Sequence, residues 1–175
     1  MNPRISPVLR PGNAVLVYLQ ERLNPIFSSR LNPMYNLGAL ALFFLWAIIG
    51  SGIYIFLFYR MSLPGAYNSI ENITVGQKYL GGIMRSIHRY ASDGMVLVVA
   101  VHALQAFFSD RFRKYRWLMW VTGCVVIPVL WLEGASGYLL VADERAKMVG
   151  VELAGWFDTF PLKVEPFSRN FIQGG

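Results

Sequence analysis

The two histidines of the chain are the residues whose type and spacing could do chemistry. His88 and His102 both lie in a largely apolar stretch, Arg85–Phe108. In a helix, fourteen residues turn through about 1400°, which is about 40° short of four full turns, so both imidazoles share one face. Their separation along the axis is about 21 Å. One imidazole therefore lies near each side of a hydrocarbon core about 30 Å thick.

Imidazoles at two depths of a membrane indicate a redox cofactor. Ionisable side chains within membranes are usually functional, and histidine is a common ligand of haem iron. Two haems stacked across the membrane would suit this pair. The alternative is that each ring only hydrogen-bonds to a neighbouring helix. A single zinc site is excluded, because ligands this far apart cannot meet on one ion.

Four glycines repeat the spacing of the histidines. Gly38 and Gly52 lie fourteen residues apart in one apolar segment, as do Gly123 and Gly137 in another. Glycine costs about 1 kcal/mol relative to alanine inside a helix, and it is tolerated where a group approaches the backbone closely. Helix packing through small residues explains the glycines alone. Flat macrocycles at two levels among three helices explain the glycines and the histidines together.

Charged residues complete the candidate site. Arg85 and Arg89 bracket His88, and Arg116 begins the third apolar segment near the level of His102. Haem propionates are anionic and need such partners, although snorkelling to the interface is the ordinary use of a single arginine. Asp93 and Glu133 are intramembrane carboxylates, suited equally to proton handling and to structural pairing.

Composition and hydropathy place these residues in an all-α membrane protein. The chain has 175 residues, of which 55% are hydrophobic and 15% charged, a balance that favours lipid contact. Transmembrane helices are predicted at 37–59, 84–108 and 117–141. The first contains no charge and would reach roughly 34 Å. Helices are the expected state, because a lone strand cannot satisfy its backbone in lipid.

Three regions follow from this pattern. Residues 1–36 form an N-terminal arm with a surface amphipathic helix, 37–142 form the three-helix haem-binding domain, and 143–175 form an interfacial segment and tail. Within them we expect the surface helix to begin at Asn13 as N-cap and to end at Asn24–Pro25. We expect the connection 60–80 to be a loop with a turn at Pro64–Gly65. Val149–Phe160 is predicted to lie amphipathically at the interface.

The basic residues predict an orientation rather than a nucleic-acid partner. The net charge of +6 is assigned to loops beside the membrane. Each side carries eight Lys or Arg, but the dense cluster in 111–116 lies close to two membrane ends and predicts a cytoplasmic N-terminus. The single cysteine, Cys124, is interpreted as a small packing residue.

With these residues in place, the sequence resembles the N-terminal, haem-binding part of cytochrome b, and most of all the short form of photosynthetic b/f complexes. The resemblance rests on "GGIMRSIHRYASDGMVLVVAVHALQAFF", "FRKYRWLMWVTG" and "GASGYLL", and it covers roughly residues 14–142. It implies two haems b, with His88 as axial ligand of the haem near the outer, positive side and His102 as ligand of the inner one. It also implies a role for each other site residue: the porphyrins would pack on Gly38, Gly52, Gly123 and Gly137, and the propionates would meet Arg85, Arg89 and Arg116.

The sequence departs from that family at three places. The family's other two axial histidines lie on a fourth helix, and this sequence contains no third histidine. Asn36 stands where the b/f form has the cysteine of a covalently attached extra haem, so that haem is expected to be absent. The family usually has Pro-Trp soon after "GY.L", and the run "GYLLVADERAK" lacks this pair. The resemblance therefore does not extend to the outer quinone pocket.

These departures predict a split cytochrome b. A second polypeptide would supply the fourth helix and two histidines. The stretch "WFDTFPLKVEPFSRNF" resembles the interfacial region before that helix, so the break falls at a loop. A parallel homodimer whose histidines share the haems is the alternative.

Three functions are consistent with the sequence. The first is a di-haem subunit that carries electrons between quinol and quinone sites of a bc-type complex in a prokaryotic cytoplasmic membrane. Its partners would be a Rieske iron–sulfur protein, a c-type cytochrome, quinone and lipid, with no nucleic acid. The second is a haem-b anchor linking the quinone pool to an attached dehydrogenase or multihaem cytochrome. The third is a cofactor-free membrane scaffold. Bis-histidine haem has no open coordination site, so the first two carry electrons rather than bind substrate.

Overall fold

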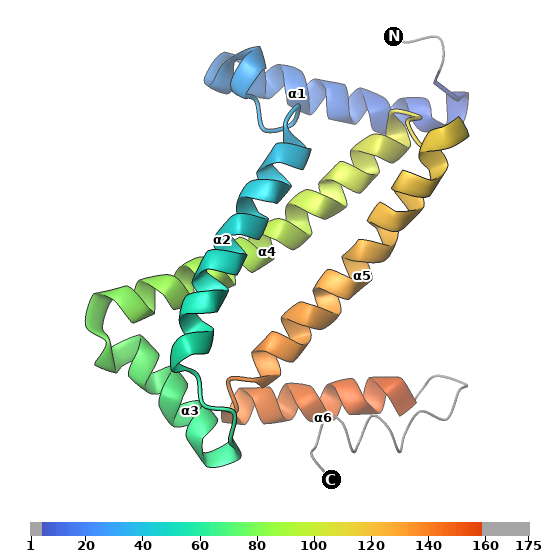
Figure 1. Cartoon of the computed structure of the whole chain (residues 1–175). Helices are drawn as coiled ribbons and strands as arrows, with labels where there is room; N and C mark the ends of the chain where they lie inside the picture. The colour runs from blue at the N-terminus through green and yellow to red at the C-terminus, as the bar shows by residue number, and fades with distance from the viewer. Residues whose placement is uncertain (1–4, 159–175) are drawn as a thin grey trace. The chain divides into compact units, whose positions relative to one another are not determined.

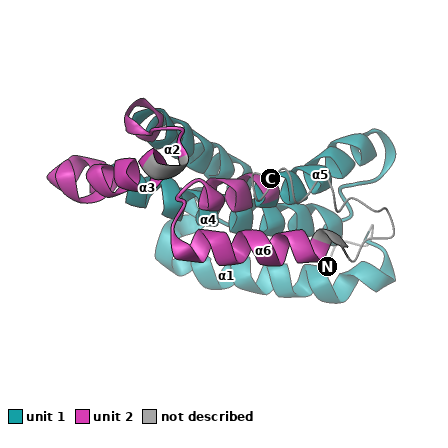
Figure 2. Ribbon diagram, turned by 90° about the horizontal axis from the view of Figure 1, so that it is seen from below, with its two compact units in different colours: residues 1–54, 84–131 teal, residues 55–83, 132–175 magenta. Residues whose placement is uncertain are grey.

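The computed structural model describes residues 5–158, and every regular element in that range is a helix (Figure 1). The chain divides into two compact units, one of residues 1–54 and 84–131 and the other of residues 55–83 and 132–175 (Figure 2). In chain order the elements are η1 (Pro7–Leu9), α1 (Arg10–Leu31), α2 (Leu37–Phe58), α3 (Leu63–Glu71), η2 (Asn72–Gly76), α4 (Lys78–Phe108), η3 (Lys114–Arg116), α5 (Trp117–Leu139) and α6 (Glu144–Asp158).

Three helices of the described range, α2, α4 and α5, are long and apolar enough to cross a membrane. The prediction of an all-α membrane protein with three transmembrane helices is therefore confirmed. The helix α4 begins at Lys78, earlier than the predicted Met84. The added residues, Lys78–Ile83, include one charge and two glycines, which interrupt the apolar run on which the predicted start rested. No residue of α5 is fully buried by the described residues, and its contact with α4 is made by Trp120, whose ring stacks on Phe107 with the ring centres 5.6 Å apart and whose Nε1 donates to the Ala103 carbonyl at 3.2 Å.

The surface helix α1 crosses the ends of α2 and α4 within the first unit (Figure 1). The prediction that Asn13 is its N-cap was wrong. The N-cap is Leu9, because Pro11 lies in the first turn, where its fixed φ favours helix initiation. The predicted end at Asn24–Pro25 was also wrong. The helix passes Pro25, whose missing N–H weakens the turn, and leaves helical geometry at Ser28 (φ 58°, ψ 159°).

A buried asparagine fixes the turn between α1 and α2. Asn32 is fully buried, and its Nδ2 donates to the Gln20 carbonyl at 2.8 Å and to Asn24 Oδ1 at 2.9 Å. Its Oδ1 accepts the N–H of Met34 at 2.9 Å. Gln105 Nε2 of α4 donates to the Met34 carbonyl at 2.8 Å. The start of α2 is therefore held against the end of α4.

Asn32→Ala is expected to lower the thermal unfolding midpoint of the detergent-purified protein by several degrees. The substitution removes hydrogen bonds to the part-buried Gln20 carbonyl and Met34 N–H, and a buried group left without a partner costs about 1–3 kcal/mol. Asn36→Ala is the matched control, because the exposed Asn36 amide also donates to two carbonyls. Equal midpoints for the two variants would contradict the role of Asn32.

In the second unit, the prediction that residues 60–80 form a loop was wrong. The helix α3 and the π-helix η2 fill most of this connection. A proline near the start of a helix is tolerated, so Pro64 begins α3 rather than a turn. Ala66, Ile70 and Ile73 are buried there, which gives the connection a small apolar core of its own.

Two further contacts order the second unit. The Tyr59 hydroxyl, just beyond α2, donates to the Leu140 carbonyl at 2.8 Å, and burial raises the pKa of Tyr59. The helix α6 begins after Asp143, whose carboxylate accepts the N–H of Ala146 at 2.7 Å as an N-cap does. The predicted interfacial segment 149–160 falls on α6 up to Asp158. Residues 159–171, including the rest of the stretch expected before a fourth helix, lie outside the described residues.

Candidate functional site

Both histidine rings of α4 lie against α2, each opposite one of its two paired glycines. A Cβ added to Gly52 would lie 3.1 Å from Cε1 of His88, and one added to Gly38 would lie 3.8 Å from Cε1 of His102. All four residues belong to the first unit. The structure thus brings the two pairs together at two levels of the same helix, in the order that their equal spacing predicts.

The His88 ring is held by hydrogen bonds to α2. Its Nδ1 lies 3.2 Å from Ser51 Oγ and 3.1 Å from the Ile48 carbonyl oxygen. Ser51 is buried, and its hydroxyl donates to the Ala47 carbonyl at 2.6 Å. None of the described residues hydrogen-bonds to Nε2 of His88. The nitrogen at the far side of the ring is therefore available to a metal.

The His102 ring has a different environment. It is exposed, and within residues 5–158 it has no hydrogen-bond partner. Its contact across to α2 is with Gly38, at ordinary van der Waals distance. This ring is therefore accessible to a ligand or partner.

The two glycines of α5 border open space. No described heavy atom lies within 4 Å of a Cβ added to Gly123, which is in the first unit, or to Gly137, which is in the second. Helix packing among the described residues therefore does not explain them. Room beside a helix is what a flat macrocycle needs.

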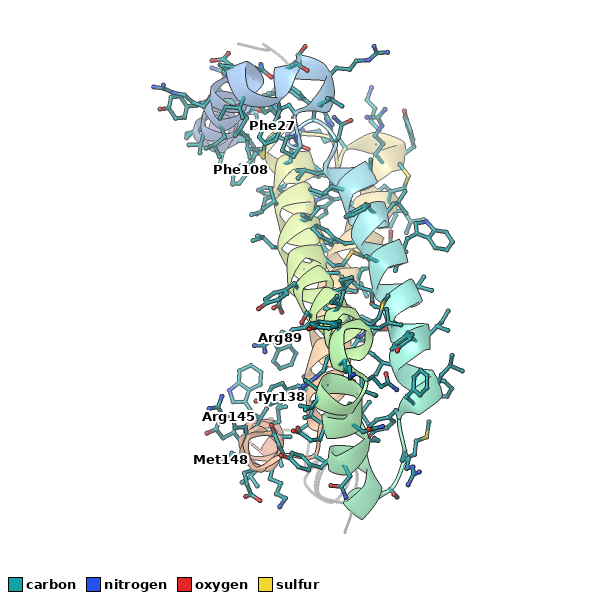
Figure 3. All side chains as sticks on the ribbon, turned by 90° about the vertical axis from the view of Figure 1, so that its left-hand side faces the viewer. Phe27, Arg89, Phe108, Tyr138, Arg145 and Met148 are labelled. Atoms are coloured by element: carbon teal, nitrogen blue, oxygen red, sulfur yellow. The ribbon has the colours of Figure 1, made fainter. Side chains whose placement is uncertain are left out.

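The arginines lie around the site rather than against the rings. Arg85 is half-buried, whereas Arg89 is exposed and projects from α4 away from α2 (Figure 3). Arg116 is exposed in η3, with its guanidinium 5.6 Å from the centre of the Tyr115 ring. Within the described range, neither Arg89 nor Arg116 forms an ion pair with a carboxylate. Both charges are free to meet an anionic group.

The carboxylates and the thiol do not assemble a protein-only metal centre. Asp93 of α4 and Glu133 of α5 are exposed, and Cys124 is half-buried. The part of the chain that the structure describes contains no group of three or more histidine, cysteine, aspartate or glutamate side chains able to hold an ion. The donor set is two separate imidazoles, which suits a metal that brings its own planar ligands.

A pocket of 280 Å³ lies between α1 and the end of α4 in the first unit. Leu16 and Val17 line it on the apolar side, and Tyr35, Gln105 and Arg111 are among its polar residues. Gln105 follows His102 by one helical turn, so the pocket is at the His102 level of the helix.

Comparison with known proteins decides the family. Residues 23–163 match the profile of cytochrome b/b6/petB. The chain belongs to the cytochrome b family.

Two relatives illustrate the match. It is 31% identical to cytochrome b6 of Heliobacterium mobile over 155 residues, which cover 87% of this chain and 70% of that protein. It is 32% identical over 156 residues to a protein of Chlorobaculum thiosulfatiphilum named cytochrome bc complex cytochrome b subunit, covering 81% of this chain and 36% of that one. With three helices able to cross a membrane, this cytochrome b is an integral membrane protein of a haem-b electron-transfer family.

The sequence analysis did not predict a role for three residues at or near this site. Ser51 touches the His88 ring, Gln105 joins α4 to the turn before α2, and Asn32 holds that turn. Ser51 could have been singled out from the sequence, because its hydroxyl directly precedes the paired Gly52 in an otherwise apolar span. Asn36 was singled out as replacing a cysteine, and its amide donates to the carbonyls of Arg30 and Asn32.

Proposed function

We propose that this cytochrome b carries electrons across the membrane between two haems b, one bound by His88 and one by His102. The observation that carries the proposal is the arrangement on α2, where each imidazole lies opposite a glycine and the two pairs are fourteen residues apart. When bound, haem iron supplies one-electron redox chemistry. The protein holds each iron through an imidazole, gives the porphyrins room at the glycines, and meets the propionates with Arg85, Arg89 and Arg116.

The second axial ligand of each iron comes from outside these 175 residues, which contain only two histidines. A further polypeptide with a fourth helix and two histidines completes a split cytochrome b in this proposal. A parallel homodimer is the other arrangement. The helix α5 supports an additional partner in either case, because none of its residues is fully buried by the described residues.

The same proposal makes this chain a subunit of a bc-type complex that oxidises quinol, together with a Rieske protein and a c-type cytochrome. Support comes from the Chlorobaculum relative, whose name places it in a cytochrome bc complex. Residues 37–142 form the haem-binding domain, with 1–36 and 143–175 at the interfaces and the N-terminus in the cytoplasm of a prokaryote. The polar pocket that Tyr35 and Gln105 line suits the head group of the inner quinone, because a quinone carbonyl accepts hydrogen bonds from such side chains.

The test is the haem content of the complex purified from its native membranes. We expect two b-type haems per copy of this chain in the split arrangement, and one per copy in the homodimer, with a Rieske protein among the co-purifying chains. A chain recovered without haem would refute the proposal and leave the scaffold function. Haem accompanied by a soluble dehydrogenase instead of a Rieske protein would favour the membrane anchor.

A further inference from the structure

We propose that Ser51 is a positioning residue that, with the Ile48 carbonyl, fixes the tautomer of His88 and lowers the reduction potential of the haem on that ring. The inference rests on the proposed function, since it concerns how this chain prepares one of the two iron ligands. It assigns a role to a hydroxyl that lies in an apolar transmembrane helix and makes no contact with the second histidine.

Two oxygens of α2, Ser51 Oγ and the Ile48 carbonyl, together determine which His88 nitrogen carries the proton. A serine hydroxyl has one hydrogen, and the Ala47 carbonyl, at 2.6 Å, is its closest acceptor. The Ser51 oxygen is then left to accept from Nδ1 of His88, 3.2 Å away. The Ile48 carbonyl oxygen, 3.1 Å from the same nitrogen, can only accept. Nδ1 therefore carries the hydrogen, and Nε2 presents a lone pair to iron.

Burial keeps this arrangement in place. Ser51 is 3% exposed, so water does not compete for its hydroxyl. Gly52, the next residue, leaves only 3.1 Å between an added Cβ and Cε1 of His88, so the ring already lies close against α2. His102 has no corresponding partner among the described residues, and its ring meets Gly38 only at 3.8 Å. The two ligands are therefore prepared differently by the same helix.

The different hydrogen bonding of the two histidines should shift the two reduction potentials in a defined direction. Donation from Nδ1–H to an acceptor raises the basicity of the ligating nitrogen. A more basic ligand stabilises ferric over ferrous iron, so the potential falls. Ser51 supplies one of two acceptors to His88 and none to His102. It therefore lowers the potential of the His88 haem relative to the His102 haem, which favours electron flow from the first to the second.

The experiment is a potentiometric titration of both b-type haems in the purified complex carrying Ser51→Ala, Ser51→Thr or Ser92→Ala. Ser51→Ala is expected to shift the potential of the His88 haem upward and to leave the His102 haem unchanged. Ser51→Thr keeps the hydroxyl and should restore the wild-type value. Ser92→Ala is the matched control, because its hydroxyl donates to the His88 backbone carbonyl at 2.7 Å and not to the ring.

The outcomes separate this inference from the function beneath it. Two haems present with no shift in Ser51→Ala would overturn the inference and leave the function standing. Equal shifts of both haems, or of Ser92→Ala, would also overturn it, as would loss of the His88 haem in Ser51→Ala and Ser51→Thr alike. Loss in Ser51→Ala that Ser51→Thr reverses would support it. A wild-type complex without haem would instead refute the proposed function itself.

Discussion

His88→Ala and His102→Ala are each expected to remove about half of the b-type absorbance of the complex. Each substitution deletes the only imidazole that this chain offers at its level of α4, and axial ligation is the main covalent hold on a haem b. The two losses should be spectrally distinct, because the rings differ in their surroundings. Nδ1 of His88 has two oxygen acceptors on α2, whereas the His102 ring has no hydrogen-bond partner among the described residues.

The measurement is a reduced-minus-oxidised difference spectrum of purified complex, normalised to the amount of this chain. Tyr90→Phe is the control on the same helix, since Tyr90 is 69% exposed. It should keep both haems. Adding imidazole to the His88→Ala protein should restore part of the lost band, because the small ligand can occupy the space of the deleted ring. A full complement of haem in the protein that lacks both histidines would eliminate the ligand assignment.

The sequence predicted the features that a membrane imposes on composition. Hydrocarbon demands a run of about 20 apolar residues, so α2 and α5 were found almost to the residue. Helical geometry then turned the spacing of His88 and His102 into a shared face, and the structure brings that face onto α2 opposite Gly38 and Gly52. These inferences work because periodicity and hydropathy are properties of the chain alone.

The remainder depended on contacts that a linear pattern does not encode. The segment containing Pro64 and Gly65 forms a helix because Ala66, Ile70 and Ile73 are buried together, a tertiary gain that outweighs the turn signal. Ser51 interrupts an apolar run in the sequence, and only the packing of α4 beside it gives its hydroxyl a contact with the His88 ring. That the arginines meet haem propionates stays a prediction. Arg89 projects away from α2, so its charge and not a contact supports this role.

Gly52→Val is expected to abolish the His88 haem, whereas Gly50→Val should leave both haems in place. The two glycines lie on the same helix, two residues apart, and the two substitutions cost similar helix propensity. Their surroundings differ. A Cβ at Gly52 would lie 3.1 Å from Cε1 and 3.4 Å from Nδ1 of His88, but nothing lies within 4 Å of one at Gly50. Only the first substitution forces the ring to move.

The ring cannot move without losing its hydrogen bonds. A displacement that accommodates valine separates Nδ1 from Ser51 Oγ and from the Ile48 carbonyl, both now within 3.2 Å. It also turns Nε2 away from its ligating direction, so the haem and the hydrogen bonds should be lost together. The b-type spectrum and the thermal midpoint of the two variants measure this. Equal haem in Gly52→Val and Gly50→Val would mean that the close approach at Gly52 does not position the iron ligand. A loss confined to Gly52→Val, at a midpoint like that of Gly50→Val, would assign the effect to the ligand rather than to the fold.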